Sequence, residues 1–229
     1  MIFRQLFDQT SCTYTYLVAS HKQKEALIID PVIEHVDQYL KLLSELDLKL
    51  RFAIDTHVHA DHITGLSELR EATECATVMG EMAHLECTSI NLRDGEQLEL
   101  GEIVIQALYT PGHTSDSYCY FLLPDRIFTG DTLLIRGTGR TDFQNGDPNA
   151  QYDSLFNKLL LLPDNTYIFP AHDYNGMTVS TIGEERIHNP RLQVNTKEEY
   201  VQMMNGLELE PPELMNIAVP ANRHCGRRS

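Results

Sequence analysis

The stretch Thr56-His57-Val58-His59-Ala60-Asp61-His62 decides the fold of this chain. It places three histidines and one aspartate within six positions, directly after a short apolar strand that Phe52 and Ile54 predict. In an extended or turning segment, alternate side chains share a side, so several of these groups can converge. Neutral imidazole and carboxylate groups are the usual protein ligands of zinc, ferrous iron and manganese. Crowding so many acceptors together is costly unless a cation neutralises them, so the stretch predicts a metal site rather than a polar surface loop.

Three later segments repeat the same arrangement, in which a histidine or an aspartate follows a predicted strand. They are Thr110-Pro111-Gly112-His113-Thr114, Phe128-Thr129-Gly130-Asp131-Thr132 and Phe169-Pro170-Ala171-His172-Asp173. Residues that follow strands lie at the rim of a sheet, on loops that a rigid scaffold positions. Each segment alone is weak evidence, but together with the first stretch they predict one site at a sheet edge.

The remaining pattern mixes strand and helix signals throughout, without an internal repeat or a linker. Apolar, β-rich runs predict strands at 13–19, 25–30, 52–54, 78–79, 97–100, 102–108, 118–123, 126–128 and 167–169. Apolar residues at helical spacing predict helices at 36–43, 66–72, 152–160 and 197–204, and the end of the chain is predicted to be coil. This order gives two similar halves and predicts an α/β sandwich of layers. We expect one domain over residues 1–229, with a short C-terminal extension from about residue 176.

The bulk charge excludes several partner classes. The net charge of −15 would repel DNA, RNA and anionic membranes, so we expect neither a nucleic-acid partner nor membrane association. No stretch approaches the roughly 18–20 apolar residues of a membrane helix, and no secretory signal is visible at the start. An anionic substrate must therefore be bound by local arginines.

The cysteine pattern predicts no disulfide framework and a reducing compartment, because the count is odd and no Cys-x-x-Cys occurs. The same spacing excludes zinc ribbons and iron–sulfur sites. Cys225 is either a redox-sensitive thiol or a buried inert one, and the other four are interpreted as packing residues. Those four are Cys12, Cys75, Cys87 and Cys119.

The His-x-His-x-Asp-His motif, followed by a histidine, an aspartate and a histidine in that order, resembles the metallo-β-lactamase superfamily. The resemblance covers roughly residues 10 to 175. It implies an αββα four-layer sandwich whose metal site lies at the edge where the two sheets meet. It does not select a reaction, because this fold hosts several chemistries. Three hypotheses remain: an iron persulfide dioxygenase, a dinuclear thioester hydrolase such as hydroxyacylglutathione hydrolase, and a non-enzymatic metal-binding domain.

Segments outside the metal motif resemble the persulfide dioxygenase family nearly from end to end. They are Gly139-Arg140-Thr141-Asp142-Phe143-Gln144, Ala171-His172-Asp173-Tyr174-Asn175-Gly176 and Ala218-Val219-Pro220-Ala221-Asn222-Arg223-His224-Cys225-Gly226. Thr138 departs from the pattern, since family members often carry a cysteine there. Hydroxyacylglutathione hydrolases normally carry a longer helical C-terminal domain that holds glutathione. Only about 55 residues follow His172 here, which disfavours the hydrolase.

This second resemblance implies one Fe(II) per subunit, held by His57, His113 and Asp131. Two histidines and one carboxylate leave three coordination positions open, the arrangement of non-haem iron oxygenases. The implied reaction oxidises glutathione persulfide with O₂ to sulfite and glutathione, a step of sulfide catabolism. The remaining motif residues would line the cavity and orient the ligands. These outer residues are His59, Asp61, His62 and His172.

The carboxylates of glutathione must be bound by cationic side chains, because the protein as a whole is acidic. The candidates are Arg140 and Arg191. An arginine fork binds carboxylates bidentately, although either arginine could instead form a structural ion pair. Tyr174 is the candidate hydrogen-bond donor near the iron, and its alternative is ordinary packing. The family resemblance also implies a homodimer. The expected compartment is the cytoplasm for a bacterial source, or the mitochondrial matrix for a eukaryotic source whose presequence is missing.

Overall fold

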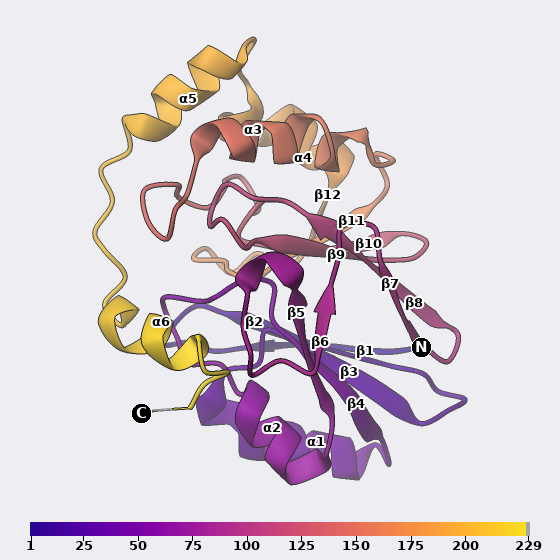
Figure 1. Cartoon of the computed structure of the whole chain (residues 1–229). Helices are drawn as coiled ribbons and strands as arrows, with labels where there is room; N and C mark the ends of the chain where they lie inside the picture. Colours follow the sequence, from indigo (N-terminus) through magenta and orange to yellow (C-terminus); the bar gives the residue numbers. More distant parts are fainter. Residues whose placement is uncertain (228–229) are drawn as a thin grey trace.

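The computed structural model describes residues 1–227, and it contains two mixed sheets packed face to face (Figure 1). The first sheet takes its strands in sequence order. They are β1 (Ile2–Phe7), β2 (Tyr14–Ala19), β3 (Glu25–Ile29), β4 (Lys49–Ile54), β5 (Ala76–Gly80) and β6 (Ile90–Leu92). β1, β2 and β3 pair antiparallel, whereas β3 to β6 pair parallel. The parallel strands therefore send their carboxyl ends to one edge of the sheet.

The second sheet runs in the reverse of sequence order. Its strands are β12 (Ser180–Thr181), β11 (Tyr167–Pro170), β10 (Arg126–Gly130), β9 (Tyr118–Leu122), β8 (Ile103–Tyr109) and β7 (Gln97–Leu100). All neighbours are antiparallel except β10 and β11, which are parallel. Because β10 and β11 run the same way, the residues that follow them emerge side by side.

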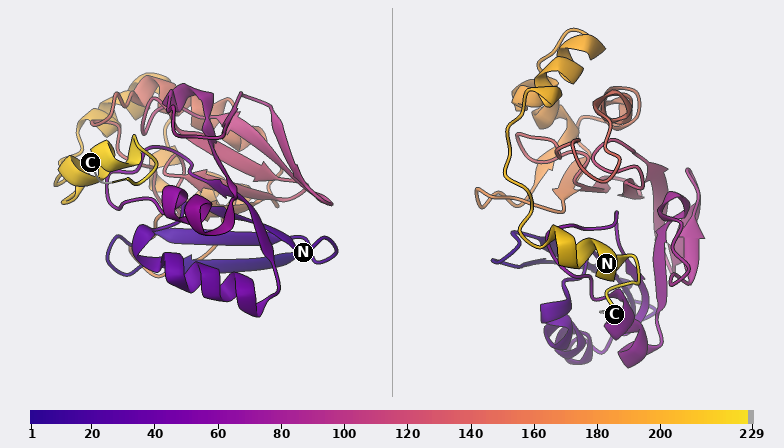
Figure 2. Two further views of the ribbon diagram at one scale, coloured as in Figure 1. Left: turned by 60° about the horizontal axis from the view of Figure 1, so that its bottom comes forward. Right: turned by 60° about the vertical axis from the view of Figure 1, so that its left-hand side comes forward.

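Helices cover the outer face of each sheet, as Figures 1 and 2 show. The first sheet carries α1 (Val36–Glu45) and α2 (Leu66–Thr73), and the second carries α3 (Pro148–Phe156), α4 (Ile182–His188) and α5 (Lys197–Asn205). The last helix, α6 (Met215–Asn222), follows a long crossing segment and lies against the first half of the molecule. Short 3₁₀ turns occupy Ile33–His35, Glu81–Ala83, Leu159–Leu161 and Pro190–Leu192.

The alternating sides of the strands build separate apolar layers. In β2, Tyr16 and Val18 face the second sheet, whereas Leu17 and Ala19 face α1 and α2. Because successive strand residues point to opposite faces, a strand covered on both sides is apolar along its whole length. Every residue of Tyr14–Ala19 is accordingly buried. The Tyr16 hydroxyl donates to the Pro170 carbonyl at 2.6 Å, which ties the first sheet to the end of β11.

The αββα sandwich expected from the sequence is confirmed, and so is each predicted hairpin. The predicted helix at 152–160 is displaced toward the N-terminus, because α3 begins at Pro148 and ends at Phe156, and a 3₁₀ turn follows at Leu159–Leu161. The expectation of coil at the end of the chain is wrong. Pro220 disfavours a helix there, yet α6 forms because Ala218 and Ala221 bury their face against Ile63. Other elements that the pattern did not predict are short or half-exposed: β1, β6, β12 and α4.

The expectation of no disulfide is also wrong, because Cys87 and Cys225 are bonded with an S–S distance of 2.05 Å. The two cysteines are 138 positions apart in the sequence, and only the docking of α6 brings them together. Spacing along the chain therefore could not reveal the pair. The other three cysteines are free thiols: Cys12, Cys75 and Cys119. Over residues 1–227, no helix combines the length and the apolar character needed to span a membrane.

Candidate metal centre

The four sequence segments meet at one edge of the sandwich. The 57–62 loop follows β4, and His113 follows β8 after a Pro-Gly turn. Asp131 comes directly after β10, and His172 comes just after the neighbouring parallel strand β11. The ends of the strands fix where these loops start. Residues that are up to 115 positions apart in the sequence, from His57 to His172, therefore lie at the same edge of the sandwich.

His57, His113 and Asp131 form a group of side chains that could hold a metal ion. One ligand atom from each lies within 4.8 Å of the others. His113 Nε2 is 3.5 Å from Asp131 Oδ2, and the two imidazole rings meet at an angle of 88° with centroids 4.9 Å apart. Two ring nitrogens and one carboxylate oxygen therefore surround a common point.

Hydrogen bonds select the ring nitrogen that each of these histidines offers. His113 Nδ1 lies 2.7 Å from the Arg140 carbonyl, so it must carry the proton and donate. His57 Nδ1 lies 3.0 Å from Thr56 Oγ1, whose hydroxyl donates to Asp30 Oδ2 at 3.1 Å. The Nε2 lone pairs of both rings thus remain free for a cation.

The charge states of this group suit a divalent cation. Burial, together with the neighbouring His59 and His113, holds the pKa of His57 well below its usual range, so the ring is neutral. Burial opposes ionisation of Asp131, but the charge and hydrogen bond of His172 hold the pKa of Asp131 below its usual range. Imidazole nitrogens beside an anionic carboxylate are a donor set for Fe(II) or Zn(II), so these residues fit the metal that the motif implies.

A second group lies against the first. His59, Asp61 and His62 also bring one ligand atom each within 4.8 Å. Asp61 Oδ2 lies 2.8 Å from His62 Nδ1, and His59 Nε2 lies 3.1 Å from Asp30 Oδ1. His59 Nδ1 and His62 Nε2 are buried and have no hydrogen-bond partner among residues 1–227. The cluster therefore keeps the residue types for a second ion.

His172 sits between the two groups and has both ring nitrogens occupied. Its Nδ1 donates to Asp131 Oδ1 at 2.7 Å, and its Nε2 donates to Asp61 Oδ2 at 2.8 Å. Burial disfavours its charge, but Asp131 and Asp61 raise the pKa of His172 well above the usual range. In this arrangement His172 is an imidazolium that bridges two carboxylates, and no lone pair remains for a metal.

Several supporting residues were not singled out from the sequence. Thr13 Oγ1 lies within 3.3 Å of Asp61, His62 and His172. Asp30 is 1% exposed and accepts from the Thr56 backbone N–H at 2.7 Å. Asp30 ends an apolar strand just as the metal-facing residues do, and that signal could have identified it.

Gly139 is a third residue of this kind. A Cβ atom there would lie 2.2 Å from the Asp131 carbonyl oxygen and 2.8 Å from His113 Nδ1. Only glycine allows the backbone to approach the two ligands so closely. The sequence identified the segment that contains Gly139, but not this steric reason for it.

A cavity of about 600 Å³ opens beside the metal cluster. Asp61, His113, Asp131 and His172 line one side of it. The cavity is also lined by the 134–140 segment, Tyr174, Arg191 and residues between 209 and 214 of the segment that connects α5 to α6. This volume is in the range of small-molecule sites.

The two candidate arginines both line this cavity but differ in their partners. Arg140 forms a fork with Asp142, with both N–O distances 2.7 Å, and donates to the Leu209 carbonyl at 3.0 Å. Its guanidinium also lies 4.4 Å from the centre of the Phe143 ring. Arg191 has a contact of 3.1 Å to Met204 Sδ, and within residues 1–227 no acidic side chain forms an ion pair with it. The guanidinium of Arg191 is therefore the freer one.

Tyr174 is 69% exposed at the mouth of the cavity. Its ring is parallel to that of His172, with an interplanar angle of 5° and centroids 6.1 Å apart. The side chain is thus beside the metal cluster without being packed into the core.

Comparisons with known proteins agree with this geometry. A sequence model described as the metallo-beta-lactamase superfamily matches residues 12–172. A Mus musculus protein named "Persulfide dioxygenase ETHE1, mitochondrial" is 43% identical over 228 residues, which cover 99% of this chain and 89% of that protein. The chain belongs to the persulfide dioxygenase family of the metallo-beta-lactamase superfamily. The crystal structure of ETHE1 from Myxococcus xanthus covers 99% of this persulfide dioxygenase chain and is itself covered completely, with a TM-score of 0.97 and 51% identity.

Hydrolases of the superfamily are more distant from this persulfide dioxygenase chain. A hydroxyacylglutathione hydrolase of Dictyostelium discoideum is 34% identical over 171 residues, which cover 70% of the chain and 62% of that protein. The resemblance to the persulfide dioxygenases that the sequence segments indicated is thus confirmed, and so is a metal-binding superfamily with a histidine and aspartate site.

Proposed function

We propose that this chain is an iron-dependent persulfide dioxygenase that converts glutathione persulfide, O₂ and water to glutathione and sulfite. His57, His113 and Asp131 would hold one Fe(II) per subunit. A ferrous ion held there would supply the redox chemistry that joining dioxygen to sulfur requires. The name of the Mus musculus relative, which covers nearly the whole chain, supports the same reaction.

The residues of the chain prepare the site for that ion. The Arg140 carbonyl and the Thr56 hydroxyl keep the protons of His113 and His57 on Nδ1, so both rings present Nε2. His172 binds one oxygen of Asp131 and leaves the other facing His113. Such outer hydrogen bonds fix the orientation of ligands and tune their basicity.

The cavity can orient a substrate that carries carboxylates. Arg191 presents a guanidinium without a carboxylate partner among the described residues, so it is the proposed site for a glutathione carboxylate. Tyr174 is the proposed hydrogen-bond donor at the cavity mouth, beside His172. Arg140 also lines the cavity, but its pairing with Asp142 and its bond to the Leu209 carbonyl suit it to holding the cavity wall.

The single observation that carries a mononuclear site is the position of His172. Both of its ring nitrogens donate to carboxylates, so His172 is not free to join His59, Asp61 and His62 as a ligand of a second ion. The test is anaerobic loading with Fe(II), followed by oxygen uptake when glutathione persulfide is added. We expect stoichiometric oxygen uptake and sulfite release. The proposal fails if no oxygen is consumed while a lactoylglutathione thioester is cleaved rapidly.

The second candidate is a dinuclear thioester hydrolase. It is favoured by one observation, the unpartnered and buried His59 Nδ1 and His62 Nε2 beside Asp61. Metal analysis of the purified protein separates the two candidates. About one ion per subunit supports the dioxygenase, and two tightly held ions per subunit support the hydrolase.

Assembly and location are part of the same proposal. We propose a homodimer, which light scattering of the purified chain would test. The proposed location is the bacterial cytoplasm or, for a eukaryotic source, the mitochondrial matrix, in keeping with the mitochondrial name of the Mus musculus relative.

A further inference from the structure

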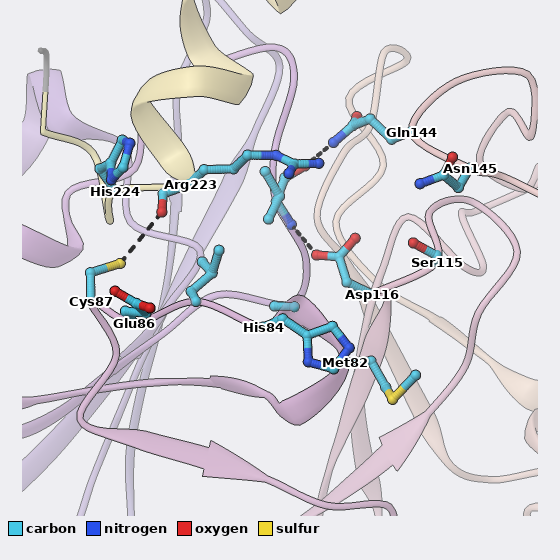
Figure 3. A pocket seen from close by; sticks show the side chains of 13 residues that line it. Met82, His84, Glu86, Cys87, Ser115, Asp116, Gln144, Asn145, Arg223 and His224 are labelled. Carbon is cyan, nitrogen blue, oxygen red and sulfur yellow. Dashed lines mark hydrogen bonds between the residues drawn. The ribbon is translucent and has the colours of Figure 1, made fainter.

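The 57–62 metal loop is held from its outer side, away from the substrate cavity, by side chains that bind its backbone. Figure 3 shows two of them, Asp116 and Gln144, at a hollow behind the loop. Asp116 Oδ2 accepts from the Val58 N–H at 2.8 Å, and Gln144 Nε2 donates to the Val58 carbonyl at 2.7 Å. The peptide groups between His57 and His59 are thereby fixed on both sides of Val58.

The other end of the loop is held by one residue, Asn222, the last residue of α6. Its Nδ2 donates to the His59 carbonyl at 2.9 Å and to the His62 carbonyl at 2.8 Å. Its Oδ1 accepts from the Thr64 N–H at 2.9 Å. The side chain is 2% exposed, and all three partners are main-chain groups of the metal loop and its continuation.

These carbonyls have no regular secondary structure to bind them, because residues 57–62 form neither helix nor strand. Among residues 1–227, no other N–H donates to the His59 or His62 carbonyl. Buried main-chain groups need a partner, and an unmade bond costs more than a made one gains. Asn222 therefore decides the path of the loop between His59 and His62.

The end of α6 is itself anchored where this role requires it. The Cys225 carbonyl accepts from the Ser67 N–H at 3.0 Å, and Cys225 is bonded to Cys87. Gly226 lies so close to Thr64 that a Cβ would come within 2.0 Å of the Thr64 carbonyl oxygen. These contacts hold Asn222 against the loop independently of its own hydrogen bonds.

We infer that Asn222 is a positioning residue of the metal centre, which acts by fixing the backbone of the 59–62 segment. The His59 ring then keeps its place beside His57, with ring centroids 4.1 Å apart, and Asp61 keeps His172 against Asp131. The inference rests on the metal site of the proposed function, but not on the reaction. Functional sites require their groups to be held within about 0.5 Å, so a loosened loop weakens metal binding even when every ligand is present. A buried residue with a purely structural role would change stability alone.

The test compares Asn222→Asp with a matched core variant, Leu159→Ala. Aspartate keeps the shape and the acceptor for Thr64, but it cannot donate to the two carbonyls. Leu159 is buried among the helices of the second sheet, remote from the loop. Co(II) is the probe, added anaerobically to the metal-free protein, with affinity measured by chelator competition and site geometry by its visible spectrum.

We expect Asn222→Asp to bind Co(II) roughly tenfold more weakly with an altered spectrum, the lower end of the range for outer partners of ligands. Leu159→Ala should lower the melting temperature while it leaves Co(II) affinity and spectrum unchanged. If the buried charge prevents folding, Asn222→Leu gives the same comparison without hydrogen-bond capacity. The inference is overturned if the folded Asn222 variant binds Co(II) like the unaltered protein, or if Leu159→Ala weakens binding equally. Neither result depends on persulfide oxidation, so failure here is distinguishable from failure of the proposed reaction.

Discussion

The metal cluster has two sides, and both are built from histidines and aspartates. The two sides differ in how many ring nitrogens of their histidines are left without a hydrogen bond. On one side, His57 and His113 each form a hydrogen bond through Nδ1 to an oxygen atom of the protein, and the lone pair of Nε2 remains available. On the other side, His172 gives both nitrogens to Asp131 and Asp61. Residue type alone therefore does not make a ligand. The hydrogen-bond partners decide which atoms still carry an available lone pair.

The largest loss of metal and of activity should follow from removing one of the two histidines whose Nε2 is available. His113→Ala takes away a metal-facing nitrogen, so we expect the metal to be lost and activity to fall by more than the roughly 10–100-fold of an outer partner. Metal analysis and oxygen uptake measure both effects. His21→Ala is the matched control, since His21 is exposed in a hairpin turn. Full metal content in His113→Ala would contradict the assignment.

A smaller loss of activity should follow from a substitution beside His172, whose two ring nitrogens are both occupied. Asp61→Asn keeps the shape of the carboxylate but weakens its bonds to His172 and His62. We expect activity to fall by roughly 10–100-fold while about one ion per subunit remains bound. Loss of one ion from a protein that normally holds two would instead show that both sides bind metal.

Arg191 and Arg140 both line the cavity, and their substitution should affect different properties. Arg191→Ala removes a cation without an ion-pair partner in the described chain, so KM for glutathione persulfide should rise about tenfold, or about 1.4 kcal/mol. Metal content should not change. Arg140→Ala is the paired variant, and its larger effect should be on thermal stability, because Asp142 and the Leu209 carbonyl lose their partner. A greater rise in KM for Arg140→Ala would reverse the two assignments.

The smallest effect on activity should come from the disulfide, which lies outside the cavity. Cys87→Ala opens a loop of 138 residues, so the free energy of unfolding should fall by about 2–4 kcal/mol without reductant. Urea unfolding measures the change. Cys12→Ala, at a free and partly exposed cysteine, serves as the control. An unchanged urea midpoint in Cys87→Ala would show that the bond adds nothing to stability.

Much of this architecture was predictable because the signals are local. Asp131 and His172 each follow a strand that its own apolar run identifies, and neighbouring parallel strands bring such residues together. The helix around Tyr39 was predictable for the same reason, since its apolar residues recur at helical spacing.

The unpredicted parts depend on contacts between distant segments. Asn222 lies 160 positions after His62, and no local pattern marks it as a partner of the loop. Cys87 and Cys225 meet only because α6 returns to the first half of the molecule. Pro220 disfavours a helix at 215–222, yet tertiary burial overrides that preference and forms the helix that carries Asn222 and precedes Cys225.

Arg140 contacts both the metal centre and the wall of the substrate cavity. Its main-chain oxygen sets the tautomer of His113, while its side chain holds the 207–214 segment at the cavity wall. Redesign of that wall for a bulkier persulfide therefore acts on the metal centre as well as on the available space. A library that varies the 207–214 segment should keep Arg140 fixed and be screened for metal retention before turnover.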